Sequence, residues 1–176
     1  MTVVVDGTTG IDLVQDNVIT TADLQNGAVT PAKTQMGALP SMVRLHTANG
    51  YGSTNTMIRR FTTTVNNQGS DITYADSATL GASFTINTNG VYAVSYFEVF
   101  NSTAYAGLSL NTTTPTTVIQ SIAAAEILSL GYGTGGVGST PNAPWTGHLA
   151  AGAVIRAHTA GNASGGACQF TIQRVA

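Results

Sequence analysis

From Ser41 onward, apolar and polar residues alternate in short runs that are separated by Gly, Asn and Thr. This period of two predicts β-strands, and the intervening residues favour turns. We expect strands over residues 42–46, 57–63, 71–75, 82–86, 91–101, 105–110, 117–123, 126–132, 147–150, 154–159 and 167–175. The stretch 122–127 has no polar face and no cap, so a strand or short turn is expected there. Many short strands at this spacing indicate an all-β sandwich or barrel.

The run 91–100 is apolar on both faces of the predicted strand. Alternation places Tyr92, Val94 and Tyr96 on one face, and Val91, Ala93, Phe97 and Val99 on the other. A sandwich strand normally has one face in the core and one in water. The second face therefore needs a cover, which is either a loop of the same chain or another subunit; enrichment in Tyr favours a subunit interface. The closing run, which carries Phe170, is a candidate to pair with this strand.

The first 40 residues have a different composition and contain a short repeat. They include no aromatic residue, and the segment 17–25 aligns with 27–35, where three identities recur ten positions apart. A unit this short cannot bury its own apolar face, so it must pack on other chains or on a host surface. A tail without fixed structure is the alternative. We expect an N-terminal arm over 1–40, with a linker at 36–40, and one knob domain over 41–176.

Charge and cysteine content exclude several functions. Charged residues make up 8% of the chain and the net charge is −2, against about 25% charged residues in an average protein. This argues against nucleic acid and acidic membranes as partners. No apolar run is long enough to span a bilayer, and residues 1–6 lack the features of a signal peptide. Cys168 lies in an apolar run and is expected to be a buried small hydrophobe.

No catalytic motif emerges from the sequence. Gly131–Gly136 matches the spacing of a dinucleotide-binding loop, but the prolines that follow exclude the required helix. We expect Asp71 and Asp76 to be turn residues or partners of Arg59 or Arg60. His148 and His158 are expected on strand faces and not as metal ligands. The sequence therefore predicts a protein that is not an enzyme and that has no cofactor or metal site.

The knob resembles the globular heads of complement-type and tumour-necrosis-factor-type proteins. The resemblance rests on the segments 58–62, 71–81, 83–96, 145–156 and 169–174, which occur in the order typical of that family. One departure is Gly152-Ala153, where the family usually has Gly-Asp. The resemblance implies a jelly-roll β-sandwich of about ten strands that assembles as a homotrimer. It places Tyr92, Val94, Tyr96 and Phe170 near the three-fold axis.

The arm resembles the virion-anchoring starts and shafts of tailed-bacteriophage fibre and appendage proteins. That resemblance rests on Asp6–Ile11 and on the ten-residue repeat. It implies a short virion appendage, made in the host cytoplasm and exposed on the virion surface. The expected partners are two further copies of the chain and the major capsid protein or another virion protein. The expected anchoring residues are Ile11, Val14, Val18, Ile19, Leu24 and Val29.

Two functions remain open at this point. The first is a capsid-decoration or short head-fibre protein whose arm docks on the particle while the knob projects. The alternative is a receptor-binding tail fibre or tip module that recognises a host surface glycan or protein, because aromatic side chains in loops suit such recognition. The candidate receptor-binding residues are Tyr51, Tyr105, Tyr132 and Trp145. The alternative for these aromatic side chains is that they cap the core of the knob itself.

Overall fold

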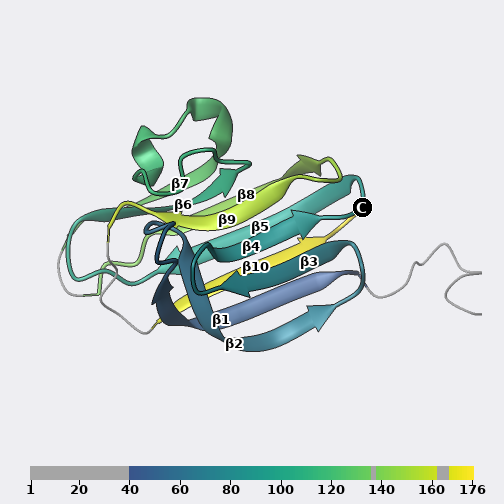
Figure 1. The fold of residues 1–176 in the computed structure, drawn as a ribbon, viewed down its shortest axis with the longest axis horizontal. Helices are drawn as coiled ribbons and strands as arrows, with labels where there is room; N and C mark the ends of the chain where they lie inside the picture. Colours follow the sequence, from purple (N-terminus) through teal and green to yellow (C-terminus); the bar gives the residue numbers. More distant parts are fainter. Residues whose placement is uncertain (1–39, 136–137, 162–166) are drawn as a thin grey trace, which may run out of the picture. The chain divides into compact units, whose positions relative to one another are not determined.

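The computed structural model describes residues 40–135, 138–161 and 167–176, and these form two antiparallel β-sheets (Figure 1). The strands are β1 (Met42–Tyr51), β2 (Arg59–Gln68), β3 (Ile72–Ser77), β4 (Gly81–Ile86), β5 (Gly90–Glu98), β6 (Ala104–Leu110), β7 (Ile127–Gly133), β8 (Asn142–Leu149), β9 (Val154–Thr159) and β10 (Cys168–Arg174). Two short 3-10 helices, η2 (Ile119–Ser121) and η3 (Ala124–Glu126), lie between β6 and β7.

The strand order defines a jelly roll. One five-stranded sheet has the order β2-β1-β10-β5-β8, and the other has the order β3-β4-β9-β6-β7. Strands that are neighbours in a sheet are mostly distant in sequence, because the chain repeatedly crosses from one sheet to the other. The predicted fold class, an all-β jelly-roll sandwich of about ten strands, is confirmed.

The antiparallel registers give the sandwich two distinct ends. Odd-numbered strands end and even-numbered strands begin at what we call the distal end, which includes Tyr51 and Gly133. The opposite, or entry, end holds Ser41, from which the described chain enters the knob. The backbone N–H of Arg174 donates to the Ser41 carbonyl at 2.9 Å, so the C-terminal strand finishes beside this entry point. Features at the distal end therefore lie away from the place where the arm joins the knob.

The core lies between the two sheets and is rich in aromatic rings. Phe84 of β4 stacks on Phe170 of β10 with ring centroids 3.8 Å apart and an interplanar angle of 9°. Phe61 of β2 packs against both Phe170 and Tyr96. Offset and edge contacts of this kind stabilise aromatic cores beyond the burial of area. This stack joins strands from both sheets.

The four residues expected at a three-fold axis lie inside this core. Tyr92, Tyr96 and Phe170 are fully buried and Val94 is nearly so, in a single copy of the chain. Their assignment to the trimer contact is therefore wrong, because their surface is already covered by the opposite sheet. Alternation along β5 is as predicted, but an apolar run on both faces does not reveal which face turns inward. The tyrosine hydroxyls are satisfied internally: Tyr92 donates to Thr88 O at 2.6 Å and Tyr96 donates to Glu98 Oε2 at 2.6 Å.

Most strand predictions match the structure, with one clear exception. Residues 117–123 are not a strand but part of an excursion, residues 111–126, that carries η2 and η3 and projects beyond β6 and β7 (Figure 1). Its Thr-rich composition resembles that of a strand, yet residues 117–123 pair with no strand among the described residues and include short-range hydrogen bonds, such as Ser121 N to Val118 O at 2.9 Å. Cys168 is buried, as predicted.

Candidate interaction surfaces

Nothing in the described ranges resembles a metal centre, since no group of three or more His, Cys, Asp and Glu side chains gathers there. No helix among the described residues is long and apolar enough to cross a bilayer. The surfaces that remain as candidates are the outer face of the β2-β1-β10-β5-β8 sheet and the aromatic side chains near the distal end. The six predicted anchoring residues of the arm (Ile11, Val14, Val18, Ile19, Leu24 and Val29) lie outside the described residues.

The outer face of β5 and β10 carries partly exposed apolar side chains. Val91, Ala93 and Phe97 of β5 point away from the core, and Val175, just past β10, is 50% exposed. A shallow, mainly apolar depression runs between the two strands and is lined by Ala93, Val94, Ser95, Thr171 and Gln173. Tyr92 and Tyr96 are buried, so this outer face is the part of β5 that another molecule can contact.

Few ionisable groups interrupt this outer face. On β1, β10, β5 and β8, alternation turns outward a set of mostly neutral residues: Met42, Arg44, His46, Gln169, Thr171, Gln173, Val91, Ala93, Ser95, Phe97, Asn142, Pro144, Thr146 and His148. Arg44 is the permanently charged member of this set and it donates to Gln169 Oε1 at 3.3 Å. A face of this composition loses little solvation energy when it is covered.

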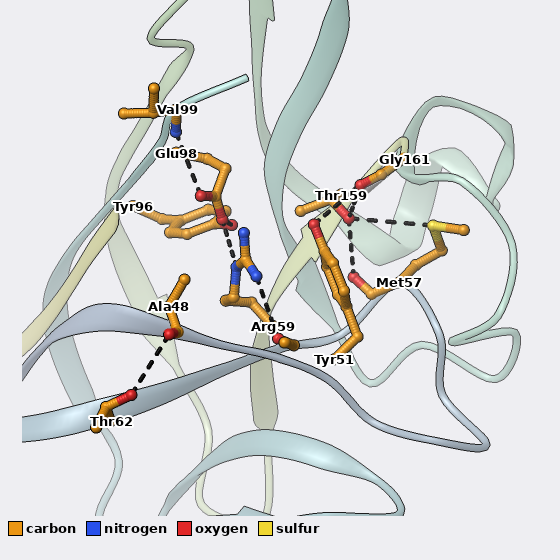
Figure 2. Close-up of polar contacts among 11 residues, drawn as sticks. Ala48, Tyr51, Met57, Arg59, Thr62, Tyr96, Glu98, Val99, Thr159 and Gly161 are labelled. Carbon is orange, nitrogen blue, oxygen red and sulfur yellow. Dashed lines mark hydrogen bonds and ion pairs between the residues drawn. The ribbon is translucent and has the colours of Figure 1, made fainter. Parts of the chain in front are cut away.

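A buried ion pair lies beneath the distal end (Figure 2). Arg59, the first residue of β2, donates through Nε to Glu98 Oε2 at 2.5 Å, and both side chains are almost completely buried. The Arg59 Nη1 also donates to Gly50 O at 3.2 Å, and the backbone N–H of Val99 donates to Glu98 Oε1 at 3.2 Å. The pair therefore connects the end of β1, the start of β2 and the end of β5.

The electrostatics of this cluster favour its charged form. Burial is the largest single influence on Arg59 and lowers its pKa, but the hydrogen bond to Glu98 and the electrostatic contributions of Tyr96, Glu98 and Tyr51 together outweigh burial, so the pKa of Arg59 is raised. Burial and the neighbouring Glu98 charge raise the pKa of Tyr96 well above its usual range, which keeps its hydroxyl a donor. The cluster has a structural role: its hydrogen bonds hold the distal strand ends in place, while Arg59 Nη2 is buried with no hydrogen-bond partner among the described residues.

Tyr51 belongs to this cluster and not to an exposed recognition surface. Its ring lies 4.4 Å from the Arg59 guanidinium carbon, in a cation–π arrangement, and its hydroxyl donates to Gly161 O at 2.9 Å (Figure 2). Trp145 of β8 is half-buried and packs against the core. Gly147 is required beside it, because a Cβ there would come within 2.7 Å of the indole ring. Tyr51 and Trp145 therefore make contacts within the knob that stabilise it.

Tyr105 and Tyr132 come together on the outer face of the other sheet. They are directly opposite one another on β6 and β7, with ring centroids 4.7 Å apart and tilted by 43°. Tyr132 is 53% exposed, and Leu130, two residues earlier on β7, is 41% exposed. Of the four predicted receptor-binding residues, the structure thus brings two together at the surface. Leu130 was not predicted, although its spacing from Tyr132 on one strand face indicates a shared surface.

His158 of β9 is buried beneath the excursion 111–126. Its Nε2–H donates to Thr117 O at 2.5 Å, while its Nδ1 has no partner among the described residues. Gly107, opposite His158 on β6, gives Ile119 of the excursion room to pack, because a Cβ there would lie 2.9 Å from that side chain. Burial lowers the pKa of His158; the nearby Arg156 acts in the same direction, while the bond to Thr117 and the Glu126 carboxylate oppose it.

The two aspartates have structural partners. Asp76 pairs with Arg60 in a bidentate arrangement at 2.8 and 3.1 Å, as one of the alternatives predicted. Asp71 accepts from Ser41 Oγ at 2.9 Å and lies 3.5 Å from Arg174 Nη1, which ties the entry end together. The Arg59–Glu98 pair was missed from sequence. Its signal was a lone Glu in an apolar strand, in phase with the inward-facing Tyr92, Val94 and Tyr96.

Comparisons with known proteins support the fold. No protein-family model and no curated protein sequence matches the chain. Among solved structures, crystal structures of murine APRIL at pH 5.0, pH 8.0 and pH 8.5 are similar, with TM-scores of 0.56, 0.54 and 0.53. Each is 12% identical and covers 78% of this chain and 100% of the other. At this identity the likeness shows a jelly roll of the tumour-necrosis-factor type and nothing about function.

The buried pair predicts a large loss of stability when one partner is removed. Glu98→Ala leaves the Arg59 charge buried without compensation, so we expect the free energy of unfolding to fall by roughly 3–5 kcal/mol. Urea unfolding of the two proteins measures this difference. The double variant Arg59→Met/Glu98→Leu, which removes both charges, should recover most of the loss. A loss below about 1 kcal/mol for Glu98→Ala, as for an exposed pair, would contradict this assignment.

Burial of His158 predicts a loss of stability in mild acid. Because its folded pKa lies below the value of about 6.5 for an unfolded His, the unfolded chain binds the extra proton first. Stability is therefore complete above about pH 6.5 and falls as the pH drops towards the folded pKa, by up to about 1.4 kcal/mol per pH unit. We expect His158→Gln to remove this part of the pH dependence in urea unfolding. His148→Gln, an exposed control on β8, should keep the wild-type slope; equal slopes for all three would contradict the prediction.

Proposed function

We propose that this chain is a non-enzymatic structural protein of a phage virion that assembles as a homotrimer. Its knob projects as a capsid-decoration or short head-fibre module, and its arm docks on the major capsid protein or another virion protein. The protein is made in the host cytoplasm and acts on the virion surface. The observation that carries the self-association is the outer face of β5 and β10, where the partly exposed apolar side chains are those of β5 and of Val175 just past β10.

This face is suited to a second copy for three reasons. Its apolar side chains are not needed for the core, which is already filled by the opposite side of β5. It bears little charge, so covering it leaves few ions without water. The depression between β5 and β10 offers a concave surface for a neighbouring side chain. The resemblance of the knob to the heads of tumour-necrosis-factor-type proteins favours an assembly of three copies.

The anchoring role rests on the repeat within residues 1–40. Each ten-residue unit is too short to be stable alone, so it gains its order from other molecules. In a trimer, three arms bind together, and the overall affinity greatly exceeds that of one arm. Docking from the entry end leaves the distal end free to project.

A second candidate function is recognition of a host surface ligand by a tail fibre or tip module. The observation that favours it is the exposed Tyr105–Tyr132 pair towards the distal end, away from Ser41. Decoration and recognition are compatible in one protein. They differ in where on the virion the protein sits and in how many copies are present.

A charge in the depression should dissociate the trimer. We expect the wild-type chain to sediment near three times 18.0 kDa. Ala93→Asp should sediment as a monomer with an unchanged circular dichroism spectrum, because covering three unpaired carboxylates costs several kcal/mol. Ala75→Asp, the same change at an exposed position of β3 in the other sheet, is the matched control and should remain trimeric. A monomeric wild type, or a trimeric Ala93→Asp, would overturn the proposed interface.

Removal of residues 1–36 should separate assembly from attachment. We expect the shortened protein to remain a folded trimer in sedimentation, because the proposed interface lies within the knob. It should no longer join virus particles, measured by its recovery with particles purified from cells that make it. Full incorporation of the shortened protein would show that the arm is not the anchor.

A further inference from the structure

We infer that Tyr105, Tyr132 and Leu130 form a binding site for a neutral saccharide. This surface, which we call the tyrosine platform, rests on the second candidate function and gives it a ligand class. It lies on the outer face of β6 and β7, where neither strand is covered by the opposite sheet. Its position towards the distal end allows it to meet a ligand in front of the particle.

The two tyrosine rings are held in positions that leave aromatic surface exposed to solvent. Tyr105 and Tyr132 are held opposite one another by the β6–β7 ladder, so their positions are set by backbone hydrogen bonds. The tilt of 43° prevents the rings from stacking flat, and Tyr132 remains 53% exposed. Leu130, which is 41% exposed, extends the apolar surface along β7, beside the place where Ile119 packs on Gly107. The result is a rigid aromatic surface that needs little reorganisation on binding.

The hydroxyl groups of the platform are available to a ligand. Neither the Tyr105 nor the Tyr132 hydroxyl has a hydrogen-bond partner among the described residues, whereas the hydroxyls of Tyr92 and Tyr96 do. A phenol hydroxyl both donates and accepts, so it can bond to the hydroxyls of a sugar ring. The apolar C–H face of the same ring can lie against an aromatic face.

The charge around the platform favours a neutral ligand. The neighbouring positions on this face of β6 and β7 are Gly107, Ser109 and Leu130, none of which is ionisable. The nearest cation along the ladder is Arg156, opposite Ser109, and it is only partly exposed. An anionic sugar would find no counter-charge here, and a charged peptide would lose solvation without a partner. A neutral saccharide matches both the apolar rings and the free hydroxyls.

Saturation-transfer difference NMR on the full chain tests this inference. The probes are the methyl glycosides of glucose, galactose, mannose and N-acetylglucosamine, each titrated separately. We expect transfer to the ring C–H protons of at least one glycoside. Tyr132→Ala should weaken that binding by about fivefold or more, as expected for loss of an aromatic contact. Tyr132→Phe should keep the C–H contact, and Leu80→Ala, at an exposed residue in the turn before β4 that is 56% exposed, is the matched control.

Three results would overturn the inference. They are no transfer to any of the four glycosides, transfer that is unchanged in Tyr132→Ala, and dissociation of the trimer by Tyr132→Ala, which would make the platform a subunit contact. Sedimentation of each sample keeps this test separate from the proposed trimer. A wild-type monomer that binds a glycoside through Tyr132 would refute self-association and leave the platform intact.

Discussion

The structure depends on which of the two apolar faces of β5 is buried in the core and which is left at the surface. One face, with Tyr92, Val94 and Tyr96, closes the core against the opposite sheet, and its tyrosine hydroxyls are bonded within the chain. That core is continuous with the Phe84–Phe170 stack, which joins the sheets. Since the inner face is complete in one copy, the outer face with Val91, Ala93 and Phe97 is left for another molecule. The proposed self-association follows from this division.

The buried Arg59–Glu98 pair explains how the distal end keeps its shape. Three strand ends meet there, and the pair bonds to the backbone of two of them as well as to Tyr96. Such a pair adds little net stability compared with apolar residues, yet it penalises any arrangement that separates its members. The tyrosine platform lies on the other sheet, so the ion pair does not contact a ligand bound there. It contributes only by keeping the distal end of the sandwich rigid.

Alternation along the chain was enough to predict the fold class and most of the strands, because strand period and turn residues are local properties. It could not orient β5, since both faces are apolar and only the packing of the opposite sheet decides between them. The 117–123 segment was mistaken for a strand because its Thr and Ile residues also suit a loop that packs Ile119 against Gly107. For Tyr51 and Trp145 the sequence left receptor binding and core capping open, and long-range contacts with Arg59 and the core, which decide in favour of a supporting role, are not visible in a single sequence. The pairing of Tyr105 with Tyr132 likewise depends on the β6–β7 register, which a single sequence does not reveal.

The central claim, a trimeric structural protein of a virion, is tested most directly by counting copies. The measurement is quantitative mass spectrometry of purified particles of the encoding virus, with the major capsid protein as the internal standard. The account predicts hundreds of copies per particle, in a multiple of three, as expected for a protein that decorates the shell. Absence of the chain from purified particles would contradict the account, while a few trimers per particle would place it on the tail as a recognition module.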